Sequence, residues 1–262
     1  MRLCIRRATT SAIRPCAPGS WIVGLCFGAA VGLMPSILAA ADFTPEQRQT
    51  IEAVIKNYLT KHPEVMIEAL QAAEDKLKSD SRNKASAALV AHRREVFDDP
   101  DSPVGGNPKG DVSLVEFFDY RCGYCKQVEP ALDALLETDR QLRVVYKEFP
   151  VLGPDSVTAA RAALASHRQG KYGVFHRAMM ATKGQINDTA VFKVAGSVGL
   201  DIERLKRDME APEIDRMLKA NLALAQALDI RGTPGFVVGN EIVPGAISLD
   251  ALKHLIELAR NK

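Results

Sequence analysis

The sequence is poor in cysteine, with five in 262 residues, and it holds 18 glycines and 14 prolines. This composition excludes the collagen-like, low-complexity and disulfide-dense classes of protein. With 47% hydrophobic and 25% charged residues, the chain has enough material for a sizeable core and one appendage. Three cysteines lie within the first 26 residues, and the other two, Cys122 and Cys125, form a CxxC. Processing of the N-terminal segment therefore decides how many cysteines the working protein keeps.

Acidic residues are absent from residues 1–41, which carry four arginines and then an apolar run beginning at Trp21. Three alanines, residues 39–41, end this segment. A basic start, a short apolar stretch and small residues at the end are typical of a cleavable secretory signal. We expect residues 1–41 to be a signal peptide cut after Ala41, and the protein to be periplasmic. A retained membrane anchor is the alternative because the apolar segment is just long enough to span a bilayer, but Pro35 disfavours it.

Without the predicted signal peptide, the chain also lacks an excess of positive charge. Loss of its four arginines leaves 30 Lys and Arg against 32 Asp and Glu, which changes the net charge from +2 to −2. We therefore expect neither a nucleic-acid partner nor attraction to an anionic membrane. Only Cys122 and Cys125 remain in the processed chain. An exported protein that keeps a single, closely spaced pair does not use disulfides as a scaffold.

The sequence pattern of residues 42–97 predicts a helical arm. Thr44-Pro45-Glu46-Gln47 is typical of a capping box, and Pro63 should separate two helices. The arm has too little mass for a core of its own, so its apolar stripe either packs on the main domain or associates with other copies. We favour a homo-oligomer formed through residues 42–97. The stripe, at helical spacing, consists of Ile51, Val54, Ile55, Tyr58, Leu59, Met66, Leu70, Ala73 and Leu77.

The order of strand and helix patterns in residues 98–262 predicts one α/β domain. Residues 112–118 form a β-rich run that is followed by the CxxC, a helical pattern and a second strand at 142–149, which together indicate a βαβ unit. A long helical stretch at about 154–230 comes next, then a hairpin around Gly239-Asn240 and a last helix capped by Ser248. This order indicates a single α/β fold with an all-helical insertion.

The motif that carries chemistry is Cys122-Gly123-Tyr124-Cys125. Directly after a strand, it places Cys122 at a helix start, where unpaired N–H groups and the helix dipole stabilise a thiolate. Cys122 is therefore the candidate nucleophile, and Cys125 is positioned to resolve a mixed disulfide. Gly123 and Tyr124 leave the pair free to close and supply no third ligand. Half of a zinc site and a purely structural disulfide are the alternatives. We expect no metal because the histidines lack paired ligand spacing, and so short a ring would constrain little of the unfolded chain.

These residues resemble the thioredoxin superfamily and, within it, the exported DsbA-type oxidoreductases, over roughly residues 103–262. The segment 117–126 looks like the active-site segment of that family, and Pro130 looks like its helix-kinking proline. Gly232-Thr233-Pro234 looks like the loop whose cis-proline faces the CxxC; an ordinary trans proline is the alternative. The resemblance implies a thioredoxin-like fold and a Thr233 backbone offered to an extended substrate. It implies no cofactor beyond the redox-active pair Cys122–Cys125.

The same resemblance gives two more residues a role. Glu116, six residues before Cys122, resembles the buried acid of the family, which would carry protons for Cys125. An exposed position on the polar face of the strand is the alternative. Lys147 lies in a segment that looks like one in which the family's lysine lies near that acid, and a solvated position is its alternative.

The direction of exchange is suggested by the residues around the cysteines. Gly-Tyr between them departs from the Pro-His of strong oxidases and from the Gly-Pro of reducing thioredoxins. Together with Thr233 and the helical arm, it resembles the disulfide isomerases of the suppressor-of-copper-sensitivity (ScsC-like) branch. The resemblance implies cysteine-containing exported proteins as substrates and a membrane redox partner that keeps the pair reduced. A thiol-based copper-binding or holdase protein that uses the same CxxC is the alternative.

Overall fold

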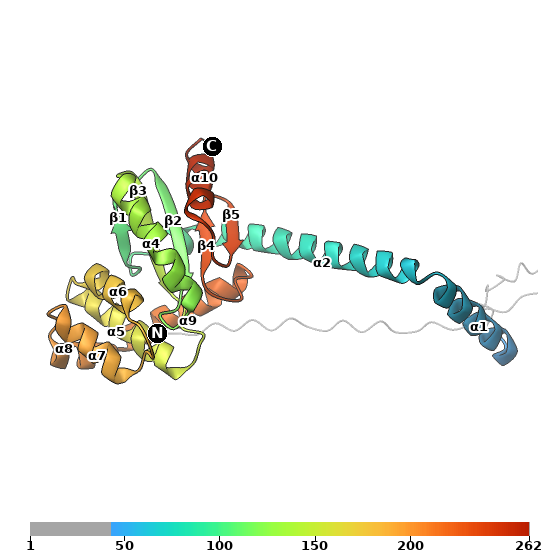
Figure 1. Ribbon diagram of the computed structural model, residues 1–262, viewed down its shortest axis with the longest axis horizontal. Helices are drawn as coiled ribbons and strands as arrows, with labels where there is room; N and C mark the ends of the chain where they lie inside the picture. Colours follow the sequence, from blue (N-terminus) through green and yellow to red (C-terminus); the bar gives the residue numbers. More distant parts are fainter. Residues whose placement is uncertain (1–42, 262) are drawn as a thin grey trace, which may run out of the picture. The chain divides into compact units, whose positions relative to one another are not determined.

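The computed structural model describes residues 43–261 (Figure 1). The predicted signal peptide, residues 1–41, lies outside this range. Contacts divide the chain into two compact units with the boundary between Lys61 and His62. The first contains helix α1 (Pro45–Lys61), and the second contains the predicted α/β fold. No helix in the described range is long and apolar enough to cross a membrane.

A mixed five-stranded sheet forms the centre of the second unit, in the order β1-β3-β2-β4-β5. The strands are β1 (Val104–Gly106), β2 (Val112–Phe118), β3 (Leu142–Glu148), β4 (Gly235–Val238) and β5 (Glu241–Pro244). Strands β2 and β3 are parallel and connected through helix α4 (Gly123–Thr138), so the predicted βαβ unit is confirmed. The predicted hairpin is the antiparallel pair β4–β5. Strand β1 was not predicted, because three residues that include two glycines show no alternation.

The helical insertion contains five helices, and Figure 1 shows α5 to α8 grouped at one end of the sheet. Their bounds are α5 (Pro154–Arg168), α6 (Tyr172–Ala181), α7 (Asp188–Ser197), α8 (Ile202–Met209) and α9 (Pro212–Ala227). The chain ends in α10 (Leu249–Arg260), where Ser248 accepts the predicted capping bond from the backbone N–H of Ala251 at 3.2 Å. The apolar periodicity of these segments therefore predicted the helices correctly.

Side chains from both faces of the sheet are buried, so β2 and β3 are almost continuously inaccessible to solvent. The larger core contains Leu114 and Phe118 of β2 together with residues of α4, α5, α6 and α10. The smaller core, on the other face, contains Phe117, Val145 and Leu224 of α9. Because helices cover both faces of β2 and β3, these strands are rich in Val, Leu and Phe. The helices also provide a dry interior in which a polar side chain is unusual.

The N-terminal helices begin as the sequence predicts. The backbone N–H of Thr44 donates to Gln47 Oε1 at 2.9 Å, and that of Gln47 donates to Thr44 Oγ1 at 3.2 Å, which is the expected capping box. After the break at His62, α2 (Pro63–Ala91) continues through the polar stretch at residues 78–84 without interruption, and α3 (Arg93–Phe97) follows.

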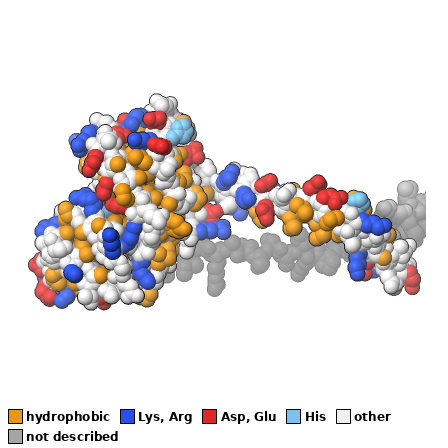
Figure 2. Space-filling view, viewed as in Figure 1, with side chains coloured by type: hydrophobic (Ala, Val, Ile, Leu, Met, Phe, Trp, Pro, Cys, Tyr) orange, Lys and Arg blue, Asp and Glu red, His pale blue; other side chains and the backbone are white. Residues whose placement is uncertain are grey.

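The end of α2 and all of α3 contribute to the core of the second unit. Leu89, Val96 and Phe97 are buried in the smaller core with Phe117 and Val145. The earlier part of α2 has no buried residue, and Figure 2 shows hydrophobic side chains gathered on its surface. Residues 85–97 therefore have a structural role that differs from that of the exposed stripe.

Candidate functional site

Cys122 lies at the N-terminus of α4. Strand β2 ends at Phe118, a short turn follows, and the backbone N–H of Cys122 donates to Asp119 O at 3.0 Å. Cys122 has an extended backbone, and its carbonyl accepts the first helical bond, from Lys126 N at 3.2 Å. It is therefore the N-cap residue, next to the unpaired N–H groups of the first helical turn, although its side chain makes no capping bond. That position favours a negatively charged sulfur.

The predicted loop at Thr233 lies directly against Cys122. The Thr233–Pro234 peptide bond is cis, as the resemblance implies. The Sγ of Cys122 donates a hydrogen bond to the carbonyl oxygen of Thr233 at 3.2 Å. The structure thus brings together the CxxC and the loop that are 111 residues apart in the sequence. Pro234 O accepts a bond from Gly245 N at 2.8 Å, which ties the loop to the end of the β4–β5 hairpin.

The two residues between the cysteines face open space. A side chain at Gly123 would meet nothing within 4 Å, and Tyr124 is 64% exposed. Neither position packs against the core, so both remain accessible to an approaching polypeptide. Cys122 itself is only 6% exposed.

Cys125 differs from Cys122 in its surroundings. Both are free thiols, but Cys125 is completely inaccessible and lies in the larger core. Burial raises the pKa of the Cys125 thiol, and the negative charge of Glu116 raises it further. Cys125 therefore stays protonated until a nearby base removes its proton.

Glu116 is a buried acid on β2. It has no exposed surface, and neither carboxyl oxygen has a hydrogen-bond partner. Burial raises its pKa well above the usual carboxyl range, and the charges of Glu129, Glu148 and Cys122 raise it further. The alternative of an exposed position is wrong, because β2 is covered on both faces. A protonated carboxyl near Cys122 and Cys125 is chemically able to exchange a proton with them.

The expectation that Lys147 lies near Glu116 is wrong. In the parallel register, Glu116 pairs with Tyr146, whereas Lys147 pairs with Phe117. Because side chains alternate across a sheet, Lys147 points to the opposite face from Glu116. Its solvated alternative is also wrong, since Lys147 is fully buried. The Nζ atom donates to Glu95 O at 2.7 Å, Ser102 Oγ at 2.8 Å and Asp99 Oδ2 at 2.9 Å.

Asp119 is a residue that the sequence analysis missed. Its Oδ1 accepts from the backbone N–H of Arg121 at 2.8 Å, and its Oδ2 accepts from those of Val151 and Leu152 at 2.9 and 3.0 Å. Arg121 adds a bond from its guanidinium to Leu152 O at 2.6 Å. The turn before Cys122 is thereby fixed to the loop after β3. An Asp directly after a buried strand, two residues before a backbone N–H that needs an acceptor, is the signal that could have indicated this role.

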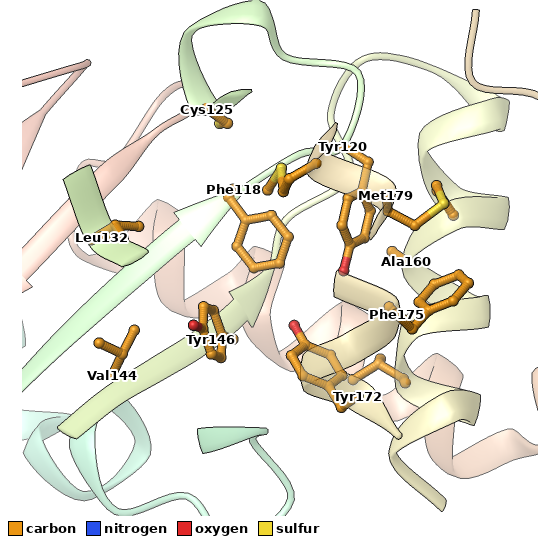
Figure 3. Close-up of a cluster of buried hydrophobic side chains, with 14 of the residues drawn as sticks. Phe118, Tyr120, Cys125, Leu132, Val144, Tyr146, Ala160, Tyr172, Phe175 and Met179 are labelled. Carbon is orange, nitrogen blue, oxygen red and sulfur yellow. The ribbon is translucent and has the colours of Figure 1, made fainter. Parts of the chain in front are cut away.

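A second group of missed residues lies inside the larger core. Glu129, Glu148 and His176 are at most 8% exposed, which is rare for ionisable side chains. Figure 3 shows Tyr120 and Tyr172 in this region with their rings pointing toward one another, and Cys125 on α4 nearby. Glu129 follows Cys125 by one helical turn, so the helical period could have placed it on the buried face of α4. No local signal identifies His176.

The described residues contain no group of three or more His, Cys, Asp or Glu side chains able to hold a metal ion. The two thiols of the CxxC remain a pair of soft ligands of the kind that binds Cu(I). The candidate site thus consists of the Cys122 thiol at the N-terminus of α4, the buried Cys125 thiol and the loop at Thr233.

Comparison with protein families gives two matches. Residues 113–257 match the family described as the DSBA-like thioredoxin domain. Residues 47–78 match the N-terminal domain of the copper resistance protein ScsC. The two matches do not overlap: the first covers most of the α/β unit, and the second covers most of α1 and the first half of α2.

Solved structures from several bacteria are similar to the chain. A thioredoxin-like oxidoreductase from Silicibacter pomeroyi is 48% identical, with 65% of this chain and 98% of that chain covered and a TM-score of 0.64. The catalytic domain of Proteus mirabilis ScsC is 27% identical, with 68% and 99% covered and a TM-score of 0.63. A periplasmic thioredoxin-like protein from Salmonella enterica serovar Typhimurium is 27% identical, with 65% and 96% covered and a TM-score of 0.59.

Curated relatives include Na⁺/H⁺ antiporters, such as one from Salinispora arenicola that is 28% identical over 62% of this chain. The chain spans about a quarter of the length of that relative, 25%. The similarity therefore concerns one part of those larger proteins.

Proposed function

Because this chain belongs to the family of DsbA-like thioredoxin domains, with ScsC-like relatives, and so to the thiol–disulfide oxidoreductases, we propose that it exchanges disulfides through Cys122 and Cys125. The substrates are cysteine-containing proteins exported to the periplasm, and the activity has isomerase character. The observation that carries this proposal is the position of the Cys122 sulfur, at the N-terminus of α4 and 3.2 Å from Thr233 O.

The chemistry follows from the difference between the two sulfurs. The Cys122 thiolate attacks a substrate disulfide, forms one S–S bond and releases the second substrate sulfur as a thiolate. Another thiolate of the substrate then attacks the substrate sulfur of the mixed disulfide. A new substrate disulfide forms, the bond to Cys122 breaks and Cys122 leaves as a thiolate, which is isomerisation. Alternatively, Cys125 loses its proton and attacks the Cys122 sulfur, which releases a reduced substrate and leaves the Cys122–Cys125 disulfide. A buried, protonated Cys125 gives the substrate time for the first route.

The Thr233 loop provides the binding surface for the substrate backbone. An extended segment that pairs with the backbone at Thr233 would bring its disulfide to the sulfur that Thr233 O contacts. The exposed Tyr124 side chain and the open space at Gly123 leave room for varied side chains. Low sequence selectivity suits an enzyme that acts on many misfolded proteins.

Several features support the periplasm as the location and a membrane protein as the reductant. The leader has the composition of a secretory signal, and the processed chain keeps no cysteine outside the CxxC. An isomerase has to be kept reduced in an oxidising compartment, which requires electrons from the cytoplasmic side. The redox pair needs no cofactor for this cycle, because the substrate disulfide and the reductant balance its electrons.

The exposed stripe supports a homo-oligomer through residues 42–97. Val54, Tyr58, Leu70 and Leu77 are each more than half exposed, although apolar side chains at helical spacing normally cover something. A second copy of this chain supplies an identical stripe, which is the simplest complement. Such an oligomer would place several CxxC sites around one substrate.

Refolding of a substrate with scrambled disulfides tests the main proposal. Wild-type protein should restore activity to scrambled ribonuclease, and Cys122→Ser should not. Cys125→Ser is the matched control: it retains the nucleophile, and it should accumulate a mixed disulfide with the substrate. Equal refolding by wild type and Cys122→Ser would refute the proposal.

Copper binding is the second candidate, because the family matched by residues 47–78 is described as a copper resistance protein. A holdase that binds Cu(I) through the same two thiols would show a tight metal complex and negligible disulfide exchange. Titration of the reduced protein with Cu(I), alongside exchange with a model disulfide, separates the two. Fast exchange without metal supports the oxidoreductase.

A further inference from the structure

The last turns of α2 contact the α/β fold at the segment that leads to the Thr233 loop. Figure 1 shows α2 meeting the sheet beside β5. Ala85 and Leu89 of the helix are buried, and Leu89 shares the smaller core with Ile230, which lies between α9 and β4. The end of α2 and the segment before the loop that faces Cys122 are thus parts of one core.

One carboxylate joins the helix to this segment. The hydroxyl of Ser81 on α2 donates a hydrogen bond to Oδ2 of Asp229, across 148 positions of sequence. The other oxygen, Oδ1, accepts from Nε of Arg231 at 2.6 Å. Asp229 therefore contacts α2 through one oxygen, and through the other it contacts a residue that lies two positions before Thr233.

The carboxyl of Asp229 carries a negative charge in this contact. The bond from Ser81 lowers its pKa, and Arg231 lowers it further, so the group is ionised at neutral pH. A hydrogen bond to an ionised acceptor is stronger than one between neutral groups. The Arg231 side chain is 83% exposed, and an exposed ion pair alone contributes little. Ser81 is half-buried, so its hydroxyl is the partner that fixes the orientation of the carboxylate.

Asp229 also has an unusual backbone for a residue other than glycine. Its φ is +57°, in the left-handed region that commonly ends a helix and is usually occupied by glycine or asparagine. The backbone N–H of Ile230 donates to Ala225 O at 2.8 Å and closes the end of α9 in this way. A glycine would form the same turn without a side chain. The acid at this position therefore adds a carboxylate that the turn itself does not need.

Few other bonds hold residues 231–234. Among the described residues, the one backbone-to-backbone hydrogen bond of this loop joins Pro234 O to Gly245 N, at 2.8 Å. A side chain at Gly232 would meet no atom within 4 Å, so the middle of the loop has open space around it. The position of Thr233 O therefore depends on how the two ends of the loop are held.

Helix α2 supports both ends of the loop. At its start, Ser81 holds the carboxylate to which Arg231 is bonded. At its end, Ile230 packs against Gly235, the first residue of β4, because a Cβ on Gly235 would lie 2.7 Å from Ile230 Cγ2. Ile230 belongs to the same core as Leu89. One polar and one apolar contact thus connect α2 with the two ends of the loop.

We propose that Ser81 is a positioning residue for substrate binding, which acts through Asp229 to keep the Thr233 loop in the conformation that pairs with a polypeptide backbone. This role deepens the proposed exchange function and rests on it. Ser81 orients the carboxylate, and the carboxylate restrains Arg231. A loop that is already held in its binding conformation loses less conformational entropy when the substrate binds. The effect is therefore on association with polypeptides and not on the chemistry of the sulfur.

Two disulfides with the same leaving group separate these effects. One is a linear peptide whose single cysteine carries thionitrobenzoate, and the other is the thionitrobenzoate disulfide of mercaptoethanol, which has no peptide backbone. The Cys122 thiolate bonds to the sulfur of the cysteine or of mercaptoethanol, the original S–S bond breaks, and coloured thionitrobenzoate leaves as a thiolate. Its release by the reduced protein, less that by Cys122→Ser, gives the second-order rate constant for each disulfide.

Ser81→Ala should lower the rate constant for the peptide about fivefold, the loss expected for one hydrogen bond, and leave that for the mercaptoethanol disulfide as in wild type. Alanine has the higher helix propensity, so a weakened α2 does not explain such a loss. Ser81→Thr keeps a hydroxyl and should retain the wild-type rate. Ser79→Ala is the matched control, at an exposed position on the same helix, and should behave as wild type.

Arg231→Met tests the same contact from the side of the loop. It removes the other partner of the Asp229 carboxylate and should slow exchange with the peptide alone. Because Ser81 and Arg231 act through one carboxylate, the variant that combines Ser81→Ala with Arg231→Met should lose less than the product of the two single losses. Losses that simply multiply would overturn the proposal.

Equal slowing with both disulfides in Ser81→Ala, or no slowing with the peptide, would also overturn it. A peptide rate as low in Ser79→Ala has the same meaning. So has a changed mass of Ser81→Ala in light scattering, because the loss would then belong to association of the stripe.

The function on which this role rests is tested by the same measurements. If wild type releases thionitrobenzoate no faster than Cys122→Ser, disulfide exchange itself is refuted. If wild type reacts with both disulfides and Ser81→Ala matches it on both, exchange stands and the role of Ser81 does not.

Discussion

Asp119 shows how much one carboxylate contributes to the active-site turn. It is 2% exposed and accepts three backbone hydrogen bonds, from Arg121, Val151 and Leu152. Backbone N–H groups inside a protein need such acceptors, because the penalty for leaving each unpaired is about 1–3 kcal/mol. The position of Cys122, three residues later, therefore depends on a buried side chain outside the CxxC.

Asp119→Ala should lower the free energy of unfolding by about 2–4 kcal/mol, because three N–H groups lose their acceptor. Exchange with a model disulfide should also slow, since the turn before Cys122 is released from the loop after β3. Urea denaturation and exchange kinetics measure the two effects. Asp155→Ala is the control: Asp155 is half-exposed and its carboxylate lies 4.0 Å from Arg121, so its loss should cost less than about 0.5 kcal/mol.

Glu116 makes stability depend on pH with a definite sign. Its pKa is raised in the folded protein, chiefly by burial, so the folded state keeps a proton that the unfolded chain releases above about pH 4.3. Its contribution to stability is thus present below that pH and is lost as the pH rises toward the folded pKa.

Glu116→Gln should therefore gain stability relative to wild type as the pH rises from about 4.3 to 8. Urea denaturation at pH 4.5, 6 and 7.5 measures the difference between the two proteins. Glu137→Gln, at an exposed position on α4, provides the control. Parallel stability curves for wild type and Glu116→Gln would show that this carboxyl is ionised in the folded state.

At the scale of elements, the two faces of the sheet carry residues with different roles. Glu116 and Glu148 lie on the face that carries the redox pair. Lys147 lies on the other, where it joins β3 to α3 through Glu95 and to the segment between α3 and β1 through Ser102. The alternation of β2 and β3 thus assigns neighbouring ionisable residues to different tasks.

Lys147→Met tests this division. Three oxygens lose their donor, and Asp99 loses its ion pair, so the free energy of unfolding should fall by about 2–4 kcal/mol. The pH midpoint for exchange with a model disulfide should stay as in wild type, because Lys147 does not face Glu116. A shifted midpoint with unchanged stability would place Lys147 functionally beside the acid after all.

The elements themselves were largely predictable from the sequence. Apolar periodicity identified β2, β3, the hairpin and the helices of the insertion, and the spacing of cysteines identified the candidate nucleophile. The contacts between side chains that lie far apart in the sequence were not predictable. The partners of Lys147 depend on the register of β2 against β3, and the contact of His176 with Glu129 depends on how α6 packs against α4. Because His176 and Glu129 are 47 positions apart, the local sequence around either residue does not indicate their contact.

At the scale of the whole molecule, the chain from the start of α2 to the end of α3 carries two kinds of apolar surface. Leu89 and Val96 are buried within the α/β unit, whereas Met66, Leu70 and Leu77 are at least half exposed. A truncation at residue 97 would therefore remove part of the core together with the stripe. Point substitutions in the stripe are the cleaner test of self-association.

Leu70→Asp combined with Leu77→Asp should reduce the mass measured by light scattering toward that of one chain, because charge in an apolar seam opposes association. Isomerisation of scrambled substrate should fall more than simple oxidation. Val90→Asp is the control: Val90 is 71% exposed on the same helix, roughly on the opposite side from Leu70. An unchanged mass in the double variant would exclude the stripe as the interface.

The open space at Gly123 has a consequence for how this chain could be adapted. A side chain added there would meet no atom within 4 Å, so substitution between the cysteines requires no repacking of the interior. The balance between oxidant and reductant depends on the stability of the neighbouring thiolate. Selection or engineering at position 123 can therefore change the stability of the thiolate while the fold and the Thr233 loop stay as they are.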